Sequence, residues 1–414
     1  MPKNLHALEK QLKLRAFDKK ESFIPVGSAM KSKRLSTGLT LEEVSEDICS
    51  VSYLSKLENN KVELSEKFSD ALFKRLDLKD YQFHVNAHID EDLSRMCEMM
   101  LEKKGDTSKL YKKYEEKIDY QSRLIMMGLA HIEQAYKRVD AYYDLILPYV
   151  SQFTDIEVSI FIYLAGVLLY EKGLYEQAYN MVLKSLYQVV DNTHLTLLTE
   201  QIKLYSLLKL CRHNDIQDVY EKLFIKLTKS HRYRHLKDIQ LALLIYQTQF
   251  KSIHEIRSDV DHIEQIDQPI KDYILARSYY RHHQNEKALQ HIEDHKFSSR
   301  MHTQLYLLIL DKLHHAPKKI MDTISNFTSN KLEDTQLKQY LFSKNTLERS
   351  EFAEYLKREY FNQGLVVEDC LVLNHLILDG QEVLSQAYFY KDASRIMQTY
   401  VRTIQTLTGS GVPA

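Results

Sequence analysis

The chain contains little glycine and little proline. Of its 414 residues, 10 are glycine and 6 are proline, and tryptophan is absent. The turns between many short strands depend on both residues, so this composition argues against a β-rich protein and favours an all-α fold. An apolar fraction of 44% is sufficient for a core and excludes a disordered chain. The length fits two or three ordinary domains, or better one small domain followed by a long helical solenoid.

Further absences exclude several functions. The four cysteines, Cys49, Cys97, Cys211 and Cys370, lie far apart without a CxxC pair. This spacing argues against zinc and against a disulfide framework, and favours a reducing cytoplasm. No Gly-rich phosphate loop, HExxH or GxSxG motif occurs, so we expect neither an enzyme nor a cofactor. Neither an apolar signal core nor a run of 18 apolar residues is present, so we expect no secretion and no membrane span.

Charge and histidine spacing give two more expectations. The 56 basic residues nearly balance the 57 acidic residues, so any DNA binding must be local rather than driven by net charge. The adjacent histidines of His282–His283 and His314–His315 point about 100° apart on a helix and cannot chelate together. His291 and His295 share a helix face but lack a third ligand, so we expect solvated histidines and no metal site.

Residues 38–60 have the pattern of two short helices joined by a tight turn. Gly38 can end the preceding helix in the left-handed conformation, and Thr40 with Glu43 forms a capping box. The spacing predicts one helix over 41–48 and, with Ser50 as its cap, a second helix that runs to about Glu58. Such a pair of helices is a candidate helix-turn-helix.

The second of these helices is predicted to have two different sides. At 100° per residue, one side packs and contains Ser50, Val51, Leu54, Leu57 and Glu58. The other side is polar, and short hydroxyls with a long cation near the start of a helix suit base edges and phosphates in the major groove. The residues that we expect at DNA are Thr40, Ser50, Ser52, Tyr53, Ser55, Lys56 and Asn59. A solvated polar face on an ordinary short helix is the alternative.

The stretch over 26–78 resembles the repressor-type five-helix DNA-binding domain. The resemblance rests on a first helix with Met30, Lys31, Lys33 and Arg34, on Gly-Leu-Thr at 38–40, and on Tyr-Leu-Ser-Lys-Leu-Glu-Asn at 53–59. It implies a structural ion pair between Arg34 and Glu58. The glycine that usually occupies the turn is missing, and this shorter turn resembles the peptide-sensing regulators of Gram-positive bacteria, of the PlcR and NprR type. In that family such a domain precedes a helical repeat array.

The rest of the chain shows a repeat of roughly 34 to 40 residues. The clearest copy spans residues 162–186, looks like a tetratricopeptide unit, and has small residues at Ala165 and Gly166 and a turn at Gly173. A second good copy lies at 275–289. Weaker copies centre on 204–227, 241–263, 305–324 and 373–396. We therefore expect a right-handed tetratricopeptide-like superhelix with a concave face.

The tetratricopeptide resemblance implies that a few polar side chains of each first helix point into this concave face. Amide, guanidinium and phenol groups on a rigid wall can hold the backbone and the carboxylate of an extended peptide, whereas simple solvation is the alternative for each residue. The expected peptide-binding residues are Tyr163, Tyr170, Gln201, Arg212, Asp238, Gln249, Arg277, Tyr280, Arg281 and Lys312.

The expected organisation has five segments. They are a basic lead-in over 1–22, the DNA-binding domain over 23–82, a linker helix over 83–104, the repeat domain over 105–407 and a flexible tail over 408–414. For the lead-in, an arm on DNA phosphate and a frayed, solvated helix are both open, and we favour the helix.

The sequence thus predicts a cytoplasmic, homodimeric transcription factor. Its partners would be a double-stranded DNA operator and a short signalling peptide that repositions the DNA-binding domains. Two alternatives come from other classes. The first is a Rap-type protein that binds or dephosphorylates a response regulator, and the second is a peptide-independent repressor whose repeats only dimerise.

Overall fold

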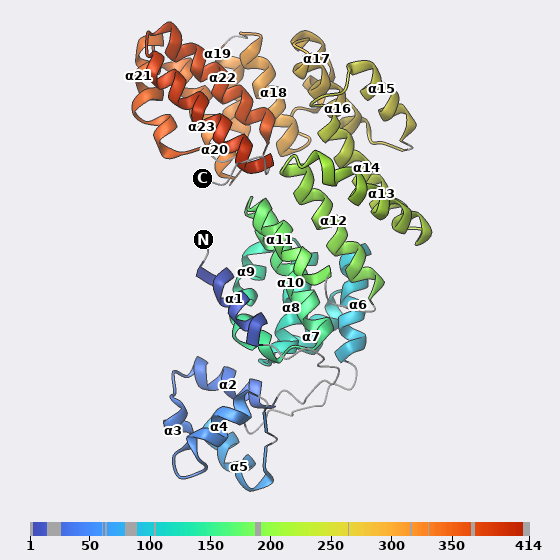
Figure 1. Cartoon of the computed structure of the whole chain (residues 1–414), viewed down its shortest axis with the longest axis vertical. Coiled ribbons are helices and arrows are strands. Elements are labelled where there is room, and N and C mark those ends of the chain that lie inside the picture. Colours follow the sequence, from blue (N-terminus) through green and yellow to red (C-terminus); the bar gives the residue numbers. More distant parts are fainter. Residues whose placement is uncertain are drawn as a thin grey trace. The chain divides into compact units, whose positions relative to one another are not determined.

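The computed structural model describes residues 3–14, 26–59, 61–62, 64–78, 89–102, 105–186, 192–263, 265–314, 317–329, 331–365 and 369–408. Within these residues the chain contains helices and no strand (Figure 1). The chain divides into two compact units, residues 1–203 and residues 204–414, and the division falls inside α12 (Thr193–Lys209). The all-α prediction is confirmed.

The first unit begins with α1 (Lys3–Leu14) and a group of four short helices, and continues with helix pairs. The four short helices are α2 (Val26–Ser36), α3 (Leu41–Ser45), α4 (Val51–Glu58) and α5 (Glu66–Arg75). The remaining helices are α6 (Ile89–Glu102), α7 (Ser108–Tyr114), α8 (Tyr120–Ile132), α9 (Tyr136–Ile146), the 3-10 helix η1 (Leu147–Gln152), α10 (Asp155–Glu171) and α11 (Tyr175–Leu186).

The second unit consists of successive helix pairs. After α12 come α13 (His213–Lys229), α14 (Tyr233–Gln247), α15 (Ile253–His262), α16 (Gln268–Arg281) and α17 (Asn285–Ile292) with η2 (Glu293–His295). They are followed by α18 (Arg300–Lys312), α19 (Pro317–Asn326), α20 (Leu332–Thr346), α21 (Arg349–Arg358) with η3 (Tyr360–Gln363), α22 (Cys370–Gln386) and α23 (Tyr390–Thr408).

The four short helices α2 to α5 enclose a small core. Its buried residues are Met30, Val44, Leu54, Leu57, Leu72, Leu76 and Leu78. Helix α2 ends as predicted, because Gly38 adopts a φ of +72° and its N–H bonds to the Leu35 carbonyl. The capping box of Thr40 and Glu43 is present at the start of α3. Local signals therefore place the end of α2 and the start of α3.

The prediction that the first helix of this pair reaches Ile48 is wrong. Helix α3 ends at Ser45, whose carbonyl accepts hydrogen bonds from the N–H groups of both Ile48 and Cys49. Asp47 takes a φ of +60° in this turn, a left-handed conformation that glycine usually supplies. The absent glycine is thus replaced by an aspartate in the same kind of conformation.

In the first unit, the lead-in helix and the expected linker helix both pack on other helices. Helix α1 contacts η1, buries Leu8, and pairs Glu9 with Lys184 of α11 at 2.8 Å. Helix α6 packs closely on α8. A Cβ atom added at Gly128 of α8 would lie only 2.1 Å from the Sδ atom of Met96 in α6. Both helices are therefore built into the first unit.

The predicted repeat copies fall on helix pairs. The clearest copy is α10 with α11, which pack closely because a Cβ at Gly166 would lie 2.6 Å from the Val182 side chain. The copy predicted from residue 204 belongs to a pair that starts earlier, at Thr193. The pair α20 and α21 was missed, since it carries no recognisable small-residue pattern.

Left-handed residues close many of the turns between helices. Gly173 has a φ of +76° between α10 and α11, as expected. The corresponding turns elsewhere use other residues with φ between 52° and 63°: Gln134, Cys211, His231, His283, His314 and Tyr388. Because most of these turns lack glycine, only the α10–α11 copy has the full sequence pattern.

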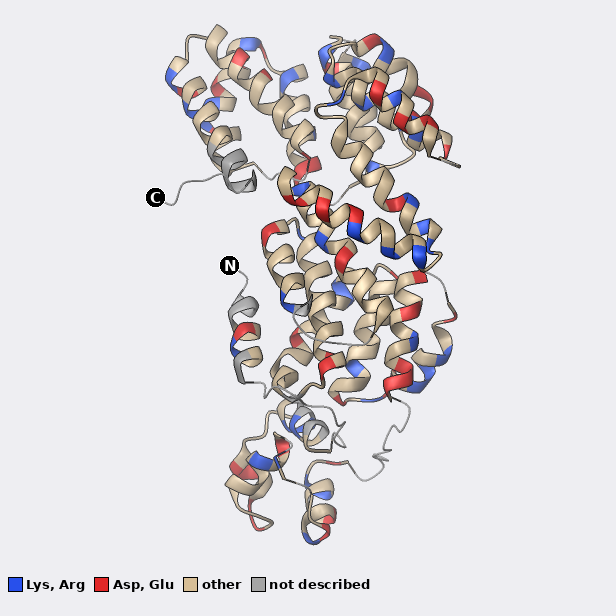
Figure 2. Cartoon of the chain, turned by 45° about the vertical axis from the view of Figure 1, so that its right-hand side comes forward, with Lys and Arg blue, Asp and Glu red and all other residues tan. Residues whose placement is uncertain are grey.

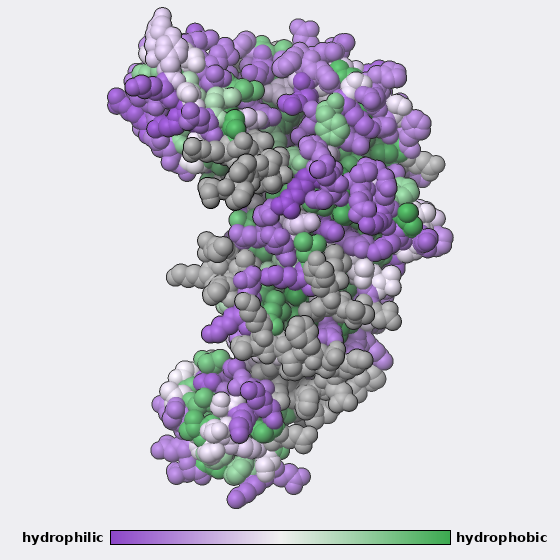
Figure 3. Space-filling model, in the orientation of Figure 1, coloured by the Kyte–Doolittle hydropathy of each residue, from purple (hydrophilic) through white to green (hydrophobic). Residues whose placement is uncertain are grey.

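Basic and acidic residues are interspersed on the helices of both units (Figure 2). The visible surface of the C-terminal repeats is mostly hydrophilic with scattered apolar residues (Figure 3). Within the described residues, no helix is long and apolar enough to cross a membrane. The expected boundaries after residues 22, 82 and 104 fall outside the described residues. Of the expected tail over 408–414, Thr408 is the last residue of α23 and residues 409–414 fall outside the described residues.

Candidate functional sites

Helix α4 separates a buried side from an exposed polar side, as the facing argument predicts. Leu54, Leu57 and Glu58 are buried, whereas Ser52 and Lys56 are exposed. Two residues assigned to the packing side, Ser50 and Val51, are instead exposed, because α4 begins at Val51 and its first turn extends beyond the core. The exposed hydroxyl and ammonium groups form a surface that can donate to base edges or phosphates.

Two of the expected DNA-binding residues act as helix caps. The Thr40 hydroxyl accepts from the Glu43 N–H at 3.2 Å, and the Glu43 carboxylate accepts from the Thr40 N–H at 2.7 Å. This hydrogen bonding lowers the pKa of Glu43. The Ser50 hydroxyl accepts from the Tyr53 N–H at 3.1 Å. Both hydroxyls are exposed, so a capping role leaves their outer sides open to a ligand.

Tyr53 and Asn59 have structural contacts of their own. The Tyr53 hydroxyl accepts from the Ser65 N–H at 2.9 Å, and its ring meets Phe68 edge-on with centroids 5.3 Å apart. These contacts join α4 to α5. The Asn59 side chain donates to the Ser55 carbonyl at 2.7 Å and accepts from the Lys31 ammonium at 3.2 Å. Sequence reasoning did not identify Lys31 as a partner of the α4 terminus.

Arg34 and Glu58 form a bidentate ion pair. Their Nε–Oε1 and Nη2–Oε2 distances are 2.7 and 2.8 Å, and both side chains are buried. The Arg34 Nη1 also donates to the Leu39 carbonyl at 3.0 Å. The hydrogen bond to Glu58 raises the pKa of Arg34. The pair joins α2 to the end of α4, which explains a carboxylate on the packing side of α4.

Arg75 is a structural residue of this domain that the sequence did not reveal. Its guanidinium donates to the Glu43 carbonyl at 2.7 Å and to the Glu46 carbonyl at 3.2 Å. It therefore satisfies carbonyls at the end of the short α3 and connects them to α5. A single arginine in the last turn of a helix carries no signal that its partners lie 29 to 32 residues earlier.

Three of the expected peptide-binding residues lie in the first unit. Tyr163 is buried in α10, and its hydroxyl lies 3.3 Å from the His131 Nε2 of α8. Tyr170 is half-buried and meets Tyr175 edge-on at 5.2 Å. Gln201 is buried in α12. Tyr163 and Tyr170 therefore share α10, whereas Gln201 lies on α12.

The other expected peptide-binding residues lie in the second unit and differ in exposure. Arg281 is exposed, and its Nε donates to the Gln249 carbonyl at 3.3 Å. This contact joins the end of α16 to the turn after α14. The half-buried members are Arg212, Asp238, Gln249 and Lys312. Among the expected residues of the second unit, these four and Arg281 retain side-chain surface that a ligand could reach.

Arg277 is buried and paired within the chain. Its Nη1 and Nη2 donate to the Asp369 carboxylate at 2.7 and 3.0 Å, and its Nε donates to the Thr248 hydroxyl at 3.2 Å. Burial alone would raise the pKa of Asp369, but the Arg277 guanidinium outweighs burial and holds this pKa well below its ordinary value. The bidentate position suited to a peptide carboxylate is therefore occupied by a carboxylate of the protein.

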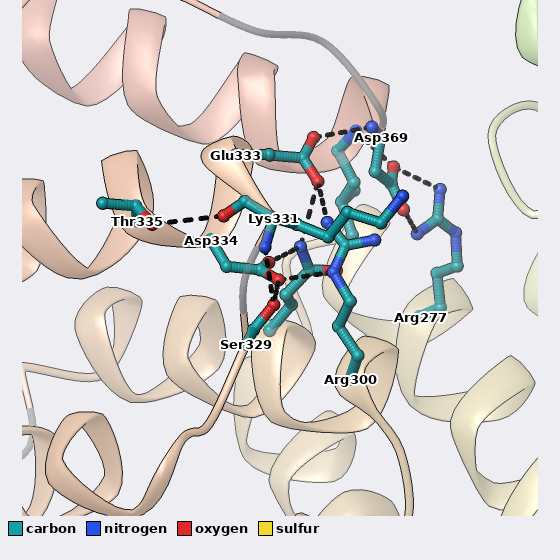
Figure 4. A network of polar contacts seen from close by, with 10 residues as sticks. Arg277, Arg300, Ser329, Lys331, Glu333, Asp334, Thr335 and Asp369 are labelled. Carbon is teal, nitrogen blue, oxygen red and sulfur yellow. Dashed lines mark hydrogen bonds and ion pairs between the residues drawn. The ribbon is translucent and has the colours of Figure 1, made fainter. Parts of the chain in front are cut away.

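The Asp369 end of α22 belongs to a wider polar network (Figure 4). The Asp369 N–H donates to Glu333 at 2.7 Å, and Glu333 accepts from Arg300 at 2.8 Å and from Gln304 at 3.0 Å. Glu333 is buried, so these donors supply the partners that a buried carboxylate needs. The network joins α18, α20 and α22.

Tyr280 belongs to a second buried network. Its hydroxyl lies 2.8 Å from the His375 Nδ1, and the His375 Nε2 lies 3.0 Å from the Asp311 carboxylate. Lys344 donates to Asp311 at 2.7 Å and to Asp379 at 2.8 Å. Tyr280 therefore contributes to the packing of α16 against α22, and its hydroxyl already has a partner.

The histidines considered as metal ligands make other contacts. His291 and His295 both approach the Asp272 carboxylate, at 2.9 and 3.5 Å, and His282 lies 3.1 Å from the Lys251 carbonyl. His283 and His314 occupy left-handed turns, and His315 lies outside the described residues. Among the described residues, no group of three or more His, Cys, Asp or Glu is placed to hold a metal ion.

Comparison with known proteins gives one family match. Residues 30–81 match the model of the helix-turn-helix family. With the exposed face of α4, this match identifies residues 30–81 as a helix-turn-helix DNA-binding domain. No curated protein matches the chain.

One solved structure is similar to the chain. It is Bacillus thuringiensis PlcR in complex with the peptide PapR7 and DNA, with 15% identity over 81% of this chain and 98% of that chain. The TM-score is 0.20, which does not establish a common arrangement of the two chains.

Proposed function

We propose that this chain is a homodimeric, cytoplasmic regulator whose repeats bind a short intercellular signalling peptide, and that the peptide modulates operator binding. The observation that carries the proposal is the exposed polar side of α4 on a closed helix-turn-helix core, in one chain with a long series of helix pairs. Ser52 and Lys56 would contact DNA, and Thr40, Ser50, Ser55 and Asn59 would flank them. Tyr53 would position α4.

The small size of the DNA-binding domain and the net charge of the chain support a homodimer. One domain of this size makes few phosphate contacts, and the chain has a formal net charge of −1. Two domains on half-sites a helical turn or more apart would raise affinity through effective concentration.

The peptide site would use the accessible polar residues of the repeats. Arg281 is the stronger candidate for a peptide carboxylate, because its guanidinium is exposed whereas that of Arg277 already holds Asp369. Gln249, which contacts Arg281, could satisfy backbone groups of the peptide. A ligand can shift DNA affinity only by its differential affinity for two arrangements of the repeats, typically by about 1–3 kcal/mol.

A two-stage experiment tests the proposal. The full chain is first used to select sequences from a random double-stranded DNA pool. Binding to the selected DNA is then measured by fluorescence anisotropy, with and without a peptide fraction from medium of the producing cells. We expect an inverted-repeat site and a change in affinity of 5-fold to 150-fold on adding the fraction, as estimated from a coupling of about 1–3 kcal/mol.

The remaining outcomes identify the alternatives. If the protein binds the selected DNA with the same affinity in the presence and absence of every peptide fraction, a peptide-independent repressor is supported. Failure to select any DNA, together with binding of a purified response regulator, would support the Rap-type alternative. Arg281→Ala serves as the variant expected to lose the peptide response while it keeps peptide-free DNA binding.

A further inference from the structure

A strongly basic stretch surrounds the turn between α13 and α14. From Lys222 to Lys237 the chain contains six Lys or Arg residues and neither Asp nor Glu, so its formal charge is +6 when the histidines are neutral. The whole chain, by contrast, has a formal net charge of −1. The excess is therefore local, and it gives the surface around this turn a positive potential.

The turn brings the basic side chains of the two helices together. Helices α13 and α14 pack on each other, and His231 between them has a φ of +55°. The Arg232 N–H donates to the Leu227 carbonyl at 2.9 Å and closes the turn. We define the basic surface by the cations on both sides of this turn, which are Lys226, Lys229, Arg232 and Arg234.

The basic surface is open to solvent. Lys226, Lys229 and Arg234 are exposed, and Arg232 is half-buried. Tyr233 lies between the two arginines in the sequence and is 61% exposed. A large ligand can therefore reach three cations and a phenol within a few turns of helix.

The remaining two cations of the stretch have partners within the chain. Lys222 pairs with Asp218 at 2.7 Å, one helical turn earlier. Lys237 donates to the Gln265 carbonyl after α15. These contacts leave the cations next to the turn as the accessible part of the charge.

Helix stability explains only half of the basic surface. Lys226 and Lys229 lie in the last turn of α13, where the helix dipole favours cations. Arg232 and Arg234 lie at the N-terminus of α14, where the same dipole disfavours cations, and the first turn of α14 contains no acidic residue. An anion bound at this surface would offset that unfavourable interaction.

The DNA-binding domain lacks a comparable excess of positive charge. Between Val26 and Leu78 eight residues are basic and nine are acidic. Lys56 is the one basic residue of α4. The attraction to DNA that is independent of sequence grows with the number of cations that meet phosphates, so this domain supplies little of it. In a chain with a DNA-binding domain, the basic surface has the charge that complements a phosphate backbone.

We propose that the basic surface is a second surface for duplex DNA, which contacts phosphates and does not read bases. Lys and Arg side chains are common donors to phosphate oxygens, and a tyrosine hydroxyl such as that of Tyr233 can also donate. Each phosphate that is neutralised releases counterions, so salt weakens such a contact steeply. The inference goes beyond the proposed function, because it involves neither α4 nor a peptide.

Titrations of the full chain with duplex DNA test the proposal. The test variant replaces three exposed cations of the basic surface: Lys226→Gln/Lys229→Gln/Arg234→Gln. The control variant removes the same charge from exposed positions elsewhere in the second unit: Lys318→Gln/Arg349→Gln/Lys391→Gln. Fluorescence anisotropy with a duplex of about 40 base pairs and arbitrary sequence is recorded from about 50 to 200 mM salt. Circular dichroism checks that both variants are folded.

We expect the test variant to bind this duplex at least about 10-fold more weakly than the parent at about 50 mM salt. The slope of log affinity against log salt concentration should become smaller by about 2–3, at about 0.9 for each lost phosphate contact. The loss should be the same for unrelated sequences of equal length. The control variant should keep the slope of the parent within about 0.5.

Three results would overturn the proposal. The first is a test variant with the slope of the parent; if that variant also loses binding to vesicles that contain phosphatidylglycerol, the surface serves an anionic membrane instead. The second is an equal loss in the test and control variants, and the third is a loss confined to one DNA sequence. Failure here differs from failure of the proposed function, because selection of an operator tests α4 whereas the salt slope on arbitrary DNA tests the basic surface.

Discussion

The DNA-binding domain and the C-terminal unit handle buried charge in different ways. In the domain formed by α2 to α5, the buried ion pair is Arg34 with Glu58, 24 positions apart, and the polar side of α4 stays outside. In the C-terminal unit, Arg277 pairs with Asp369 across 92 positions, and His375 reaches Asp311 across 64. The polar side chains of α4 are thus available to a ligand in the first region, whereas Arg277 and Tyr280 of the second region are used for packing.

This difference shows when a polar residue indicates a binding site. Short helices leave one side in solvent, so a polar side chain opposite the apolar stripe is exposed. Helices such as α16, which are packed on several sides, bury polar side chains together with their partners. In a short helix, the position of a polar side chain around the helix axis decides whether it is exposed. In a helix packed on several sides, contacts with residues distant in the sequence decide it.

The largest expected effect is acid unfolding of the C-terminal unit. Burial would raise the pKa of Asp311 and Asp369, but His375 and Lys344 at the first and Arg277 at the second hold both values well below the ordinary 3.8. A pKa lowered by folding contributes stability that is complete above the unfolded value and is lost as pH falls towards the folded value. We expect constant stability from pH 7 to about pH 5 and a steep loss below about pH 4.

Hydrogen exchange of peptides from α16 to α22 at each pH measures this effect. The Asp311→Asn/Asp369→Asn variant is the control and should show a flatter pH dependence. Unchanged protection of the parent protein at pH 3 would contradict the expectation.

Arg277→Ala should destabilise the C-terminal unit by roughly 3–5 kcal/mol, because it leaves the Asp369 carboxylate buried without its cation. Urea unfolding followed by circular dichroism measures the loss. Arg281→Ala, four residues later and exposed, is the matched control and should change stability by less than about 0.5 kcal/mol. Replacement of both partners, Arg277→Met with Asp369→Leu, should cost less than the single change. Equal stability of the Arg277 and Arg281 variants would remove the contrast between the two regions.

Glu58→Ala should destabilise the DNA-binding domain by about 3 kcal/mol, at the low end for a buried pair, since Arg34 keeps its bond to the Leu39 carbonyl. Hydrogen exchange in α2 and α4 reports this region separately from the repeats. The double change Arg34→Met/Glu58→Leu is expected to recover part of the loss. If exchange in α2 and α4 is unaffected by Glu58→Ala, the pair does not hold the two helices together.

Lys56→Ala should weaken DNA binding by roughly 1–3 kcal/mol if the ammonium reads a base. A uniform loss over many sequences with a smaller salt slope would indicate a phosphate contact instead. Anisotropy titrations at several salt concentrations distinguish the two. Lys74→Ala, also exposed but on α5, is the control. The same affinity for both variants and the parent would exclude Lys56 from the interface.

The smallest expected effects concern the left-handed turns. His283→Gly should stabilise the C-terminal unit by about 0.5–1 kcal/mol, because glycine adopts a positive φ without steric cost. Asp47→Gly should gain less, since a short polar side chain tolerates this conformation better. The midpoints of urea unfolding show which variant gains more stability. A loss of stability in His283→Gly would mean that the histidine side chain stabilises the protein by more than its backbone strain destabilises it.

Much of the DNA-binding domain was predictable from sequence. Gly38, Thr40 with Glu43, and Ser50 act on backbone groups within a few residues, so their effect does not depend on the rest of the fold. Glu58 was assigned to Arg34 only through a family resemblance, because no local rule pairs residues 24 positions apart. The exposure of Ser50 and Val51 and the end of α3 at Ser45 were not predicted, because both depend on how far the core of the domain extends.

In the repeats, sequence alone determined that the chain is all-α and that α10 and α11 form a pair, because small residues and a turn glycine leave a local pattern. Only the tertiary structure decided which polar residues are accessible: it buried Arg277 against Asp369 and left Arg281 in solvent. Helix formation is governed by interactions over a few residues, whereas these contacts depend on how successive pairs stack. Each helix pair is rotated slightly relative to the one before it, and these rotations add up over several pairs. No local pattern in the sequence specifies the total rotation.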